Sequence, residues 1–418
     1  MHTTIKNSCL WLLAAGWPII ASAGAAPAEL ARGAYLAKLG DCVACHSAPK
    51  GKPFAGGLPM QTPVGTIYST NISPDRSTGI GAWSARDFEQ ALRHGVSKDG
   101  HKLYPAMPYP SYAKLRDDDV AALYVYFMKG VAPVAQGNRA SDIRFPLNMR
   151  WPLGVWNLVF VDQGSYRDKP GNSVEWNRGA YLTQGLGHCG SCHTPRGAGF
   201  QEKALDERSG AFLSGAELDG WSASSLRAEP RTGLAGWSSA DVQAFLRTGS
   251  NQHASAFGPM TDVINNSTQY LTDADVRAMA TYLRSLPGQH PAAPPAPGLR
   301  TGTGARLYGQ YCAHCHSATG TGAAPWLAPL AGNPNMLSAS AASLINVTLN
   351  GTPDLVIQGV PAPYPMPAFR ALLNDRELAD VLSYARASWG NHAAAVDPAE
   401  VAKVRLHSGT GSTVALKK

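Results

Sequence analysis

Three copies of one five-residue pattern divide the chain: Cys42-Val43-Ala44-Cys45-His46, Cys189-Gly190-Ser191-Cys192-His193 and Cys312-Ala313-His314-Cys315-His316. The spacing C-x-x-C-H is typical of covalent haem attachment. Two thiols on adjacent turns bond the two vinyl groups of one porphyrin, and the next residue offers an imidazole to the iron. With seven Cys and twelve His in 418 residues, chance predicts about 0.003 such patterns. We therefore predict three covalently bound haem c groups.

The cysteines of these patterns could instead hold zinc, act as redox dithiols or form disulfides. Zinc would require a second ligand pair near each pattern, and the one other cysteine, Cys9, lies near the N-terminus in an apolar run. Haem is therefore the preferred interpretation. It assigns haem attachment to Cys42, Cys45, Cys189, Cys192, Cys312 and Cys315, and iron ligation to His46, His193 and His316.

Each iron also needs a sixth ligand, and Met is a frequent partner of His in cytochromes c. One Met follows each pattern at a similar place, in Ala106-Met107-Pro108, Pro259-Met260 and Pro365-Met366-Pro367. We expect these segments to be loops, in which proline removes backbone donors and restricts the chain. A Met in an apolar loop can simply fill space, but the repeated position favours ligation. The predicted ligand pairs are His46/Met107, His193/Met260 and His316/Met366.

Histidines outside the patterns are weaker candidates for the sixth ligand. His94 and His101 lie in the first repeat and His253 lies in the second, so none of them recurs in all three repeats. We interpret them as surface or loop residues.

The sequence around each pattern also repeats, which predicts three units of one fold. A helical lead-in precedes each pattern and carries a glycine: Gly33, Gly179 and Gly304. A second helix is expected to close each unit, over 117–129, 273–286 and 375–389, with Tyr126, Tyr282 and Tyr384 in register. The glycine would allow the two helices to approach closely beside the haem. These tyrosines could equally be ordinary core residues.

Capping residues mark several helix starts. Ser84 and Ser238 are each followed by Asp three residues later, which predicts N-caps. Thr272 and Asn374 are expected to cap the second and third closing helices. Arg116 occupies the corresponding position in the first unit, where we expect the neighbouring Asp117 to cap instead.

Composition and charge narrow the class of protein. Gly (43) and Pro (31) are abundant, which favours loop-rich domains built around a prosthetic group. The formal charge of +7 would be largely offset by haem propionates, and Lys and Arg form no basic run, so nucleic-acid binding is not predicted.

Residues 1–23 resemble a secretory signal with an A-x-A cleavage site. The apolar run within this segment is interrupted by Gly16 and Pro18 and is short for a membrane span. The mature chain is therefore expected in the periplasm.

The predicted fold is mostly α-helical, with three tandem class-I-like cytochrome c domains and long Gly/Pro-rich loops. Its segments are the signal peptide 1–23, domain one 26–135, an ordered connector 136–172, domain two 173–287, a Pro-rich linker 288–298, domain three 299–392 and a polar tail 393–418 with one short helix. No G-x-G-x-x-G opening a helix, P-loop or G-x-S-x-G is present. We therefore expect no catalytic residues and a mechanism of outer-sphere one-electron transfer.

The chain resembles the three-haem cytochrome c subunit of bacterial membrane-associated dehydrogenases that act on alcohols, gluconate, sorbitol, fructose or aldehydes. The resemblance rests on the three patterns, the run Gly-Thr-Ile-Tyr-Ser-Thr-Asn-Ile-Ser-Pro-Asp at 65–75, the Trp-Ser helix starts and the Pro-Met segments. It implies an electron-transfer subunit that takes electrons from a flavin, quinoprotein or molybdenum catalytic subunit. It also implies delivery to ubiquinone or another membrane acceptor, at the outer face of the cytoplasmic membrane.

Two departures from the family accompany this resemblance. The second unit has the sequence 225–229 where the first has 71–75, so the propionate side of the second haem is expected to be hydrogen-bonded differently. The tail has no evident membrane segment. Rival functions are a peroxidase- or reductase-like haem enzyme with one open iron site, or a haem-bearing scaffold. An enzyme of that kind should lack the Met ligand in one unit, and the second unit is the first place to look.

Overall fold

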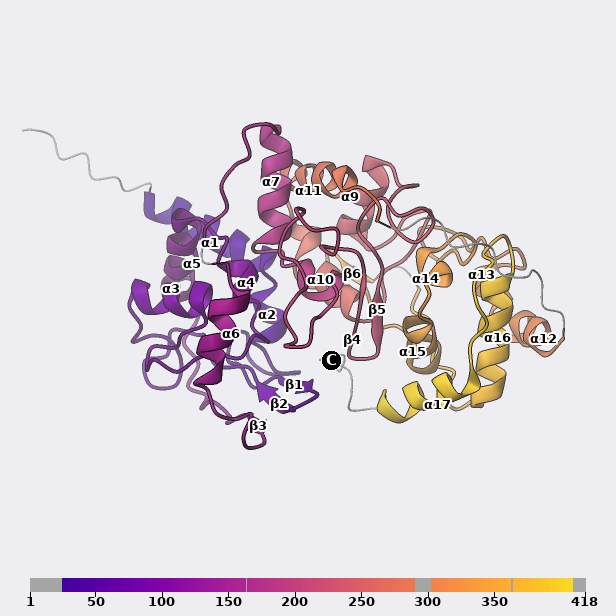
Figure 1. The fold of residues 1–418 in the computed structure, drawn as a ribbon, viewed down its shortest axis with the longest axis horizontal. Coiled ribbons are helices and arrows are strands. Elements are labelled where there is room, and N and C mark those ends of the chain that lie inside the picture. Colours follow the sequence, from indigo (N-terminus) through magenta and orange to yellow (C-terminus); the bar gives the residue numbers. More distant parts are fainter. Residues whose placement is uncertain (1–24, 163, 290–301, 362–363, 409–418) are drawn as a thin grey trace, which may run out of the picture.

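The structure, a computed structural model, describes residues 25–162, 164–289, 302–361 and 364–408. The predicted signal peptide and most of the predicted Pro-rich linker lie outside these residues. The described chain is mostly helical, which confirms the predicted fold class at that level (Figure 1). We call residues 25–135 unit one, 173–289 unit two and 302–408 unit three.

A pair of packed helices forms the frame of each unit. The pairs are α1 (Ala25–Leu39) with α5 (Asp117–Lys129), α7 (Val174–Gln184) with α11 (Asp273–Ser285), and α12 (Thr303–Tyr311) with α16 (Asp375–Ala387). A glycine lies at each crossing. A Cβ added at Gly33 would be 2.0 Å from the Ala122 carbonyl oxygen and 2.6 Å from the Tyr126 Cβ. Gly179 and Gly304 meet the closing helices in the same way. The predicted Gly–Tyr contact is therefore confirmed in all three units.

A short helix carries each C-x-x-C-H pattern: α2 (Cys42–Cys45), α8 (Gly190–His193) and α13 (Ala313–His316). Unit one and the connector add an antiparallel sheet of β1 (Pro59–Thr62), β2 (Gly65–Tyr68) and β3 (Asp142–Ile143), with helices α3 (Ala85–His94), α4 (Tyr109–Tyr112) and α6 (Pro152–Phe160). Unit two adds the hairpin β4 (Ala216–Leu218)–β5 (Trp221–Ala223), α9 (Ser239–Thr248), α10 (Pro259–Asn266) and the 3₁₀ helix η1 (Thr268–Tyr270). Unit three adds α14 (Pro334–Leu337), α15 (Ala342–Asn350), the hairpin β6 (Val356–Ile357)–β7 (Val360–Pro361) and α17 (Pro398–His407).

Most predicted helix caps are present. Ser84, Ser238 and Asn374 form capping boxes, and Thr272 accepts a hydrogen bond from the third backbone N–H of α11. The prediction for Asp117 is wrong. Helix α5 begins at that residue with no side-chain cap, because the Asp117 carboxylate instead accepts a hydrogen bond of 2.7 Å from a buried arginine of α3. Helices α11 and α16 also end one and two residues before the predicted ends.

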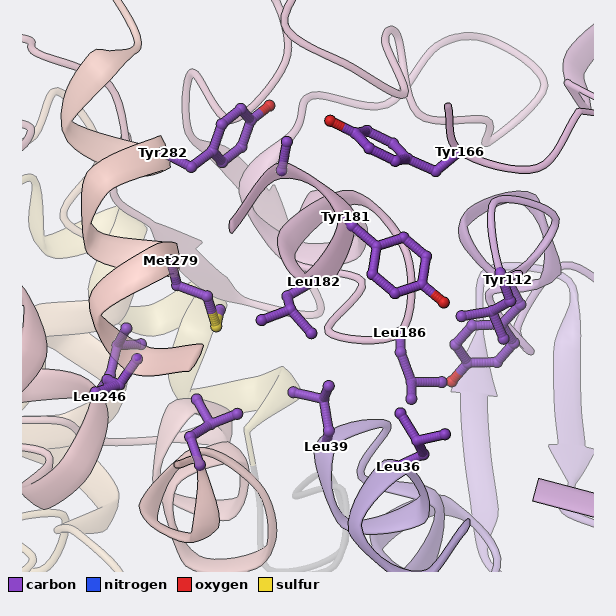
Figure 2. Close-up of a cluster of buried hydrophobic side chains, with 14 of the residues drawn as sticks. Leu36, Leu39, Tyr112, Tyr166, Tyr181, Leu182, Leu186, Leu246, Met279 and Tyr282 are labelled. Atoms are coloured by element: carbon purple, nitrogen blue, oxygen red, sulfur yellow. The ribbon is translucent and has the colours of Figure 1, made fainter. Parts of the chain in front are cut away.

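Units one and two share one hydrophobic core, whereas unit three has its own. Figure 2 shows Leu36 and Leu39 of α1 in the same cluster as Leu182 and Leu186 of unit two. All four side chains are at most 2% exposed. The first two units therefore form one continuous packed body.

Reciprocal hydrogen bonds also join units one and two. Tyr181 of α7 donates to Asp119 of α5 at 2.5 Å, and Tyr35 of α1 donates to Asp275 of α11 at 2.6 Å. Each Asp is also paired with an arginine from its own unit's lead-in helix. The repeated sequence Arg-Gly-Ala-Tyr-Leu thus supplies an arginine to its own unit and a tyrosine to the other. This exchange gives the interface an approximate two-fold symmetry.

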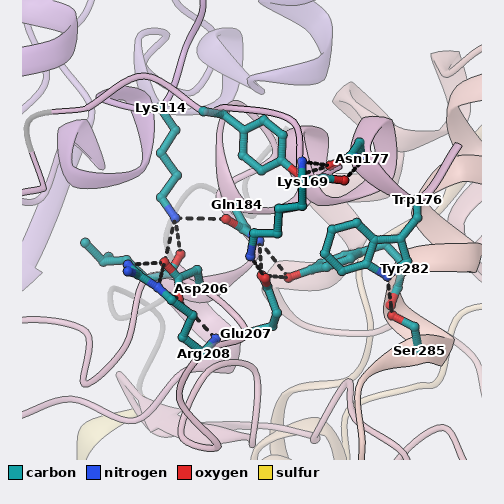
Figure 3. A network of polar contacts seen from close by, with 12 residues as sticks. Lys114, Lys169, Trp176, Asn177, Gln184, Asp206, Glu207, Arg208, Tyr282 and Ser285 are labelled. Carbon is teal, nitrogen blue, oxygen red and sulfur yellow. Dashed lines mark hydrogen bonds and ion pairs between the residues drawn. The ribbon is translucent and has the colours of Figure 1, made fainter. Parts of the chain in front are cut away.

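A buried lysine extends this interface (Figure 3). Lys114 of unit one donates to Gln184 at 2.9 Å and to the Leu205 carbonyl at 2.6 Å, both in unit two. Gln184 in turn donates to Glu207 at 2.5 Å, and Glu207 pairs with Lys169 of the connector. Burial lowers the pKa of Lys114 to about 8.

The connector and the tail are both packed against the units. Strand β3 extends the sheet of unit one. Helix α17 places Val401 in the core of unit three, and Arg405 bonds Asp375 at 2.6 Å. The segment predicted as a polar tail therefore contributes to that core. Within the described ranges, we find no helix with the length and apolar character needed to span a bilayer.

Candidate haem-binding sites

The histidines of the three patterns share one hydrogen bond. The Nδ1 atom of His46 lies 2.7 Å from the Thr70 carbonyl oxygen, and Nδ1 of His193 lies 2.7 Å from the Ser224 carbonyl. His316 makes the same bond at 2.8 Å, to the Ala328 carbonyl. Because a carbonyl can only accept, Nδ1 must carry the proton, and in the neutral ring Nε2 keeps its lone pair for a metal.

Burial favours the neutral ring. It lowers the pKa of His46, His193 and His316 below the usual value, although the carbonyl bond acts in the opposite direction. A neutral imidazole with a fixed tautomer is the form that ligates a metal. The three histidines are therefore prepared in the same way to bind an iron through Nε2.

The cysteines of the three patterns repeat one arrangement. The first cysteine is half-buried, the second is exposed, and none of them forms a disulfide. Burial raises the pKa of Cys42 and Cys189 to about 12 and that of Cys312 to about 11. Such thiols stay protonated at neutral pH, whereas the attacking cysteine of a redox dithiol is normally a low-pKa thiolate. The raised pKa values argue against the redox-dithiol interpretation.

The carbonyl partners were not singled out from the sequence. Thr70 and Ser224 occupy equivalent places, immediately before the segments 71–75 and 225–229. The two carbonyl partners precede Gly79 and Gly233 by the same number of residues, and this equal spacing in the two repeats could have identified them. A Cβ at Gly79 would be 2.2 Å from the Ser73 carbonyl, and one at Gly233 would be 2.4 Å from the equivalent Arg227 carbonyl.

The side chains of these two segments bond differently. The Asn71 side chain donates at 2.7 Å to the carbonyl of Val134, near the end of unit one, and at 3.1 Å to the carbonyl of Gln136, the first residue of the connector. In unit two the fully buried Arg227 donates to the carbonyls of Phe212 and Pro287, each at 2.8 Å. The loop that holds His193 is therefore fixed to the end of its own unit.

The three candidate methionines are all half-buried. Met107 lies in a turn, where the Tyr109 N–H donates to its carbonyl at 2.8 Å. Met366 lies in a loop and is held through its backbone by Thr352, with hydrogen bonds of 2.8 and 3.0 Å. Met260 departs from the predicted loop, because it lies in the first turn of α10. Pro259 is the first residue of that helix, where its fixed φ suits a helix start.

The other histidines have different partners. His101 pairs with Asp99 at 2.5 Å. His253 stacks on the Trp237 ring, with centroids 5.2 Å apart and an interplanar angle of 17°. His188 bonds the Leu186 carbonyl at 2.8 Å. As predicted, His101 lies on the surface and His253 lies in a loop, whereas His94 is the last residue of α3.

These features fit covalent haem. Each unit offers two thiols in C-x-x-C spacing, a neutral imidazole anchored at Nδ1 and a half-buried thioether. Among the residues that the structure describes, no three His, Cys, Asp or Glu side chains gather into a metal cage. An iron carried by a porphyrin needs no such cage, because the macrocycle supplies four ligands.

Comparisons with known proteins agree with this chemistry. Residues 178–287 match the family described as Cytochrome c, and residues 300–384 match that described as Cytochrome C oxidase, cbb3-type, subunit III. The gluconate 2-dehydrogenase cytochrome c subunit of Pantoea cypripedii is 49% identical over 397 residues, which cover 90% of this chain and 89% of that protein.

The cytochrome c subunits of alcohol dehydrogenase (quinone) are similar over a still larger part of the chain. Those of Gluconacetobacter polyoxogenes and Gluconobacter oxydans are each 45% identical, across 96% of this chain and 89% of each relative. Cytochrome c domains carry covalent haem c, and these relatives are named as cytochrome c subunits of dehydrogenases. The chain therefore belongs to the cytochrome c subunits of bacterial dehydrogenases, and it is an electron-transfer subunit rather than the catalytic enzyme.

Proposed function

We propose that the chain binds three haem c groups and relays single electrons from a periplasmic dehydrogenase that oxidises alcohols, sugars or aldehydes. The acceptor is ubiquinone or another respiratory carrier, and the protein lies peripherally on the outer face of the cytoplasmic membrane. The observation that carries the proposal is the same Nδ1–carbonyl bond at His46, His193 and His316. Unit one has the same bond and the same Gly–Tyr helix crossing as the other two units.

In this proposal the residues 26–135, 173–287 and 299–392 each form one cytochrome c domain. The six cysteines attach the haems, and the ligand pairs are His46/Met107, His193/Met260 and His316/Met366. Haem supplies a one-electron iron couple when bound. The chain fixes each imidazole through its carbonyl partner. Local hydrogen bonds of the backbone hold each methionine in place. Because no proton or substrate bond must be handled, the relay needs rigid ligands rather than an acid or a base.

The packing of units one and two supports transfer between their sites. Helix α2, which carries the first pattern, contacts α10, which carries Met260. Ser267, immediately after α10, donates to the Leu39 carbonyl at 2.8 Å, just before that pattern. The proposed attachment site of the first haem would thus lie beside the helix that carries the proposed ligand of the second. A short separation of this kind favours rapid electron exchange.

The partner is inferred from the relatives, whose names place them in gluconate and alcohol dehydrogenases. The catalytic subunit is of the flavin, quinoprotein or molybdenum type. In this proposal the catalytic subunit defines the substrate, because the resemblance of this chain extends to cytochrome c subunits alone.

The test is to export the full chain in a host with haem-maturation machinery and to measure its intact mass. We expect three added haems in the wild type and two in each variant with both cysteines of one pattern changed to Ala. Ferric spectra should show the long-wavelength band of Met ligation, and Met107→Ala, M260A and M366A should each remove about one third of it.

Two results would refute the proposal. The first is an added mass of fewer than three haems. The second is ready binding of cyanide to one haem of the native ferric protein, which would indicate an open iron site and favour the haem-enzyme alternative. Reduction by a purified catalytic subunit, followed by stopped-flow absorbance, distinguishes an electron carrier from a haem-bearing scaffold.

A further inference from the structure

Helix α6 of the connector turns its apolar side toward solvent. Trp151, immediately before the helix, and Val155, Leu158 and Val159 within it are 71%, 58%, 84% and 64% exposed. Their spacing of four, three and one residues places them on one face of the helix. A helix on the surface of a soluble domain normally buries such a face and exposes its polar one. We call these four residues, with the exposed Phe145 and Leu147 that precede them, the α6 face.

Hydrogen bonds on the opposite side fix this orientation. The Asn157 side chain is 7% exposed; it accepts a hydrogen bond of 2.7 Å from the Tyr109 hydroxyl and donates at 3.1 Å to the His94 carbonyl. Trp156 donates through Nε1 to the Gly199 carbonyl of unit two at 2.8 Å. Rotating the helix to hide its apolar side would break all three bonds. The outward apolar face is therefore built into the fold.

The α6 face is large for an isolated surface feature. Phe145 and Trp151 are 77% and 71% exposed, so at roughly 150–250 Å² per aromatic side chain these two alone present about 220–370 Å². Phe200 of unit two is 55% exposed, and its neighbour Gly199 lies against Trp156 and Phe160. Apolar patches of this size mark sites of protein or membrane interaction.

The charged side chains within the segment that carries the α6 face are all basic. Between Asp142 and Asp162 the chain has no acidic residue, but it has Arg144 and Arg150. Arg144 is exposed. Arg150 donates to the Lys102 carbonyl at 2.9 Å, and its guanidinium lies 3.8 Å from the centre of the Tyr104 ring. The apolar stripe is thus flanked at one end by cations, which suits a surface of anionic headgroups over hydrocarbon.

We propose that the α6 face inserts into the headgroup and outer acyl region of a bilayer that contains anionic phospholipid. The inference rests on the proposed function and adds the surface through which the protein meets the membrane. A typical protein–protein interface carries about ten direct hydrogen bonds, whereas the side chains of the α6 face offer only hydrocarbon and one indole. Trp and Phe flanked by Arg are the residues that favour the membrane interface.

The inward side of helix α6, opposite the α6 face, packs beside one predicted ligand loop. Met107 and Trp156 both pack against the small buried cluster of Tyr109, Ala113 and Val161. Seating the α6 face on the bilayer therefore places the Met107 site of unit one near a lipid-dissolved acceptor. That placement agrees with delivery of electrons to a quinone.

The test uses the full-length holoprotein and sedimentation with lipid vesicles. Vesicles of phosphatidylethanolamine with phosphatidylglycerol should bind the wild type, and the double variant Leu158→Glu/V159E should bind at least tenfold more weakly. Leu406→Glu is the matched control, because Leu406 is 81% exposed on α17, away from the α6 face. It should bind like the wild type. Arg144→Gln should weaken binding to anionic vesicles about fivefold and leave the weak binding to phosphatidylcholine unchanged.

Equal binding of the double variant and the wild type would overturn the proposal. The proposal would also fail if the wild type formed a dimer in lipid-free size-exclusion chromatography and the double variant did not. That result would identify a second copy of the chain as the occupant of the α6 face. Loss of co-purification with a catalytic subunit, with vesicle binding intact, would assign the α6 face to that subunit. Haem content and reduction by the catalytic subunit in solution test the proposed function separately, since the double variant should retain both.

Discussion

The crossing of α12 and α16 offers a sharp test of how each haem-binding unit is built. Gly304 lies at the crossing, and a Cβ added there would be 2.3 Å from the Asp380 carbonyl oxygen and 2.9 Å from the Tyr384 Cβ. Both contacts belong to or adjoin the backbone of α16, so neither atom can move without moving the helix. Gly309 lies on the same helix, and a Cβ there would meet nothing within 4 Å. The two substitutions Gly304→Ala and Gly309→Ala are therefore matched in chemistry and differ in packing.

The expected magnitudes follow from two effects. Replacing Gly by Ala inside a helix raises the free energy of unfolding by roughly 0.5–1 kcal/mol, because it lowers the backbone entropy of the unfolded chain. Both variants have this stabilising effect. Overpacking at the crossing costs about 1–3 kcal/mol, and only Gly304→Ala incurs it. The free energy of unfolding of unit three should therefore be about 1–3 kcal/mol lower in G304A than in G309A. For a unit of this size that difference corresponds to roughly 4–24 °C in Tm.

Differential scanning calorimetry of the holoproteins measures the transition of unit three, and the haem absorbance of each variant checks that attachment is complete. We expect G309A to melt slightly above the wild type and G304A to melt clearly below G309A. If G304A melts at or above G309A, the helices have room at this crossing, and the argument from close backbone approach fails in all three units.

Three further predictions address the interface, its pH dependence and a helix cap. Tyr181→Phe removes a hydrogen bond of 2.5 Å to the buried Asp119 and should lower the free energy of unfolding of units one and two by about 1–3 kcal/mol; the exposed Tyr364→Phe is the control, and equal denaturation midpoints would contradict the role of the bond. Burial lowers the pKa of Lys114 to about 8, whereas the pKa of a lysine in the unfolded chain is about 10.4. Between these two pH values the unfolded chain binds more protons than the folded protein, so this lysine makes the protein more stable as the pH rises through that range. In denaturant titrations Lys114→Met should lack this rise in stability, and a pH profile equal to that of the wild type would refute the assignment to Lys114. Asn374→Ala removes the capping box of α16 and should cost about 1 kcal/mol, seen as a lower Tm of unit three; an unaltered Tm would show that the cap contributes nothing there.

Local sequence rules predicted most of what lies within one unit. The helix caps at Ser84, Ser238 and Asn374 follow from interactions over three residues, and the structure contains them. The exception is Asp117, where a distant arginine competes successfully for the carboxylate. Met260 is a similar case, since its proline neighbour starts a helix rather than stiffening a loop. Predictions failed where a second partner, or a second role of the same residue, outweighed the local preference.

The sequence by itself determined the chemistry of the sites and the frame of each unit. The spacing of residues along a helix predicts the two thiols, the imidazole and the crossing glycine of each unit, and this spacing can be read directly from the sequence. The tertiary structure alone decided how the units meet and which surface they present. Tyr35 and Asp275 are 240 residues apart, and the outward side of α6 is set by hydrogen bonds of Asn157 to unit one. The physical reason is that periodicity shows which residues share a face, whereas the direction of that face depends on partners brought together only by folding.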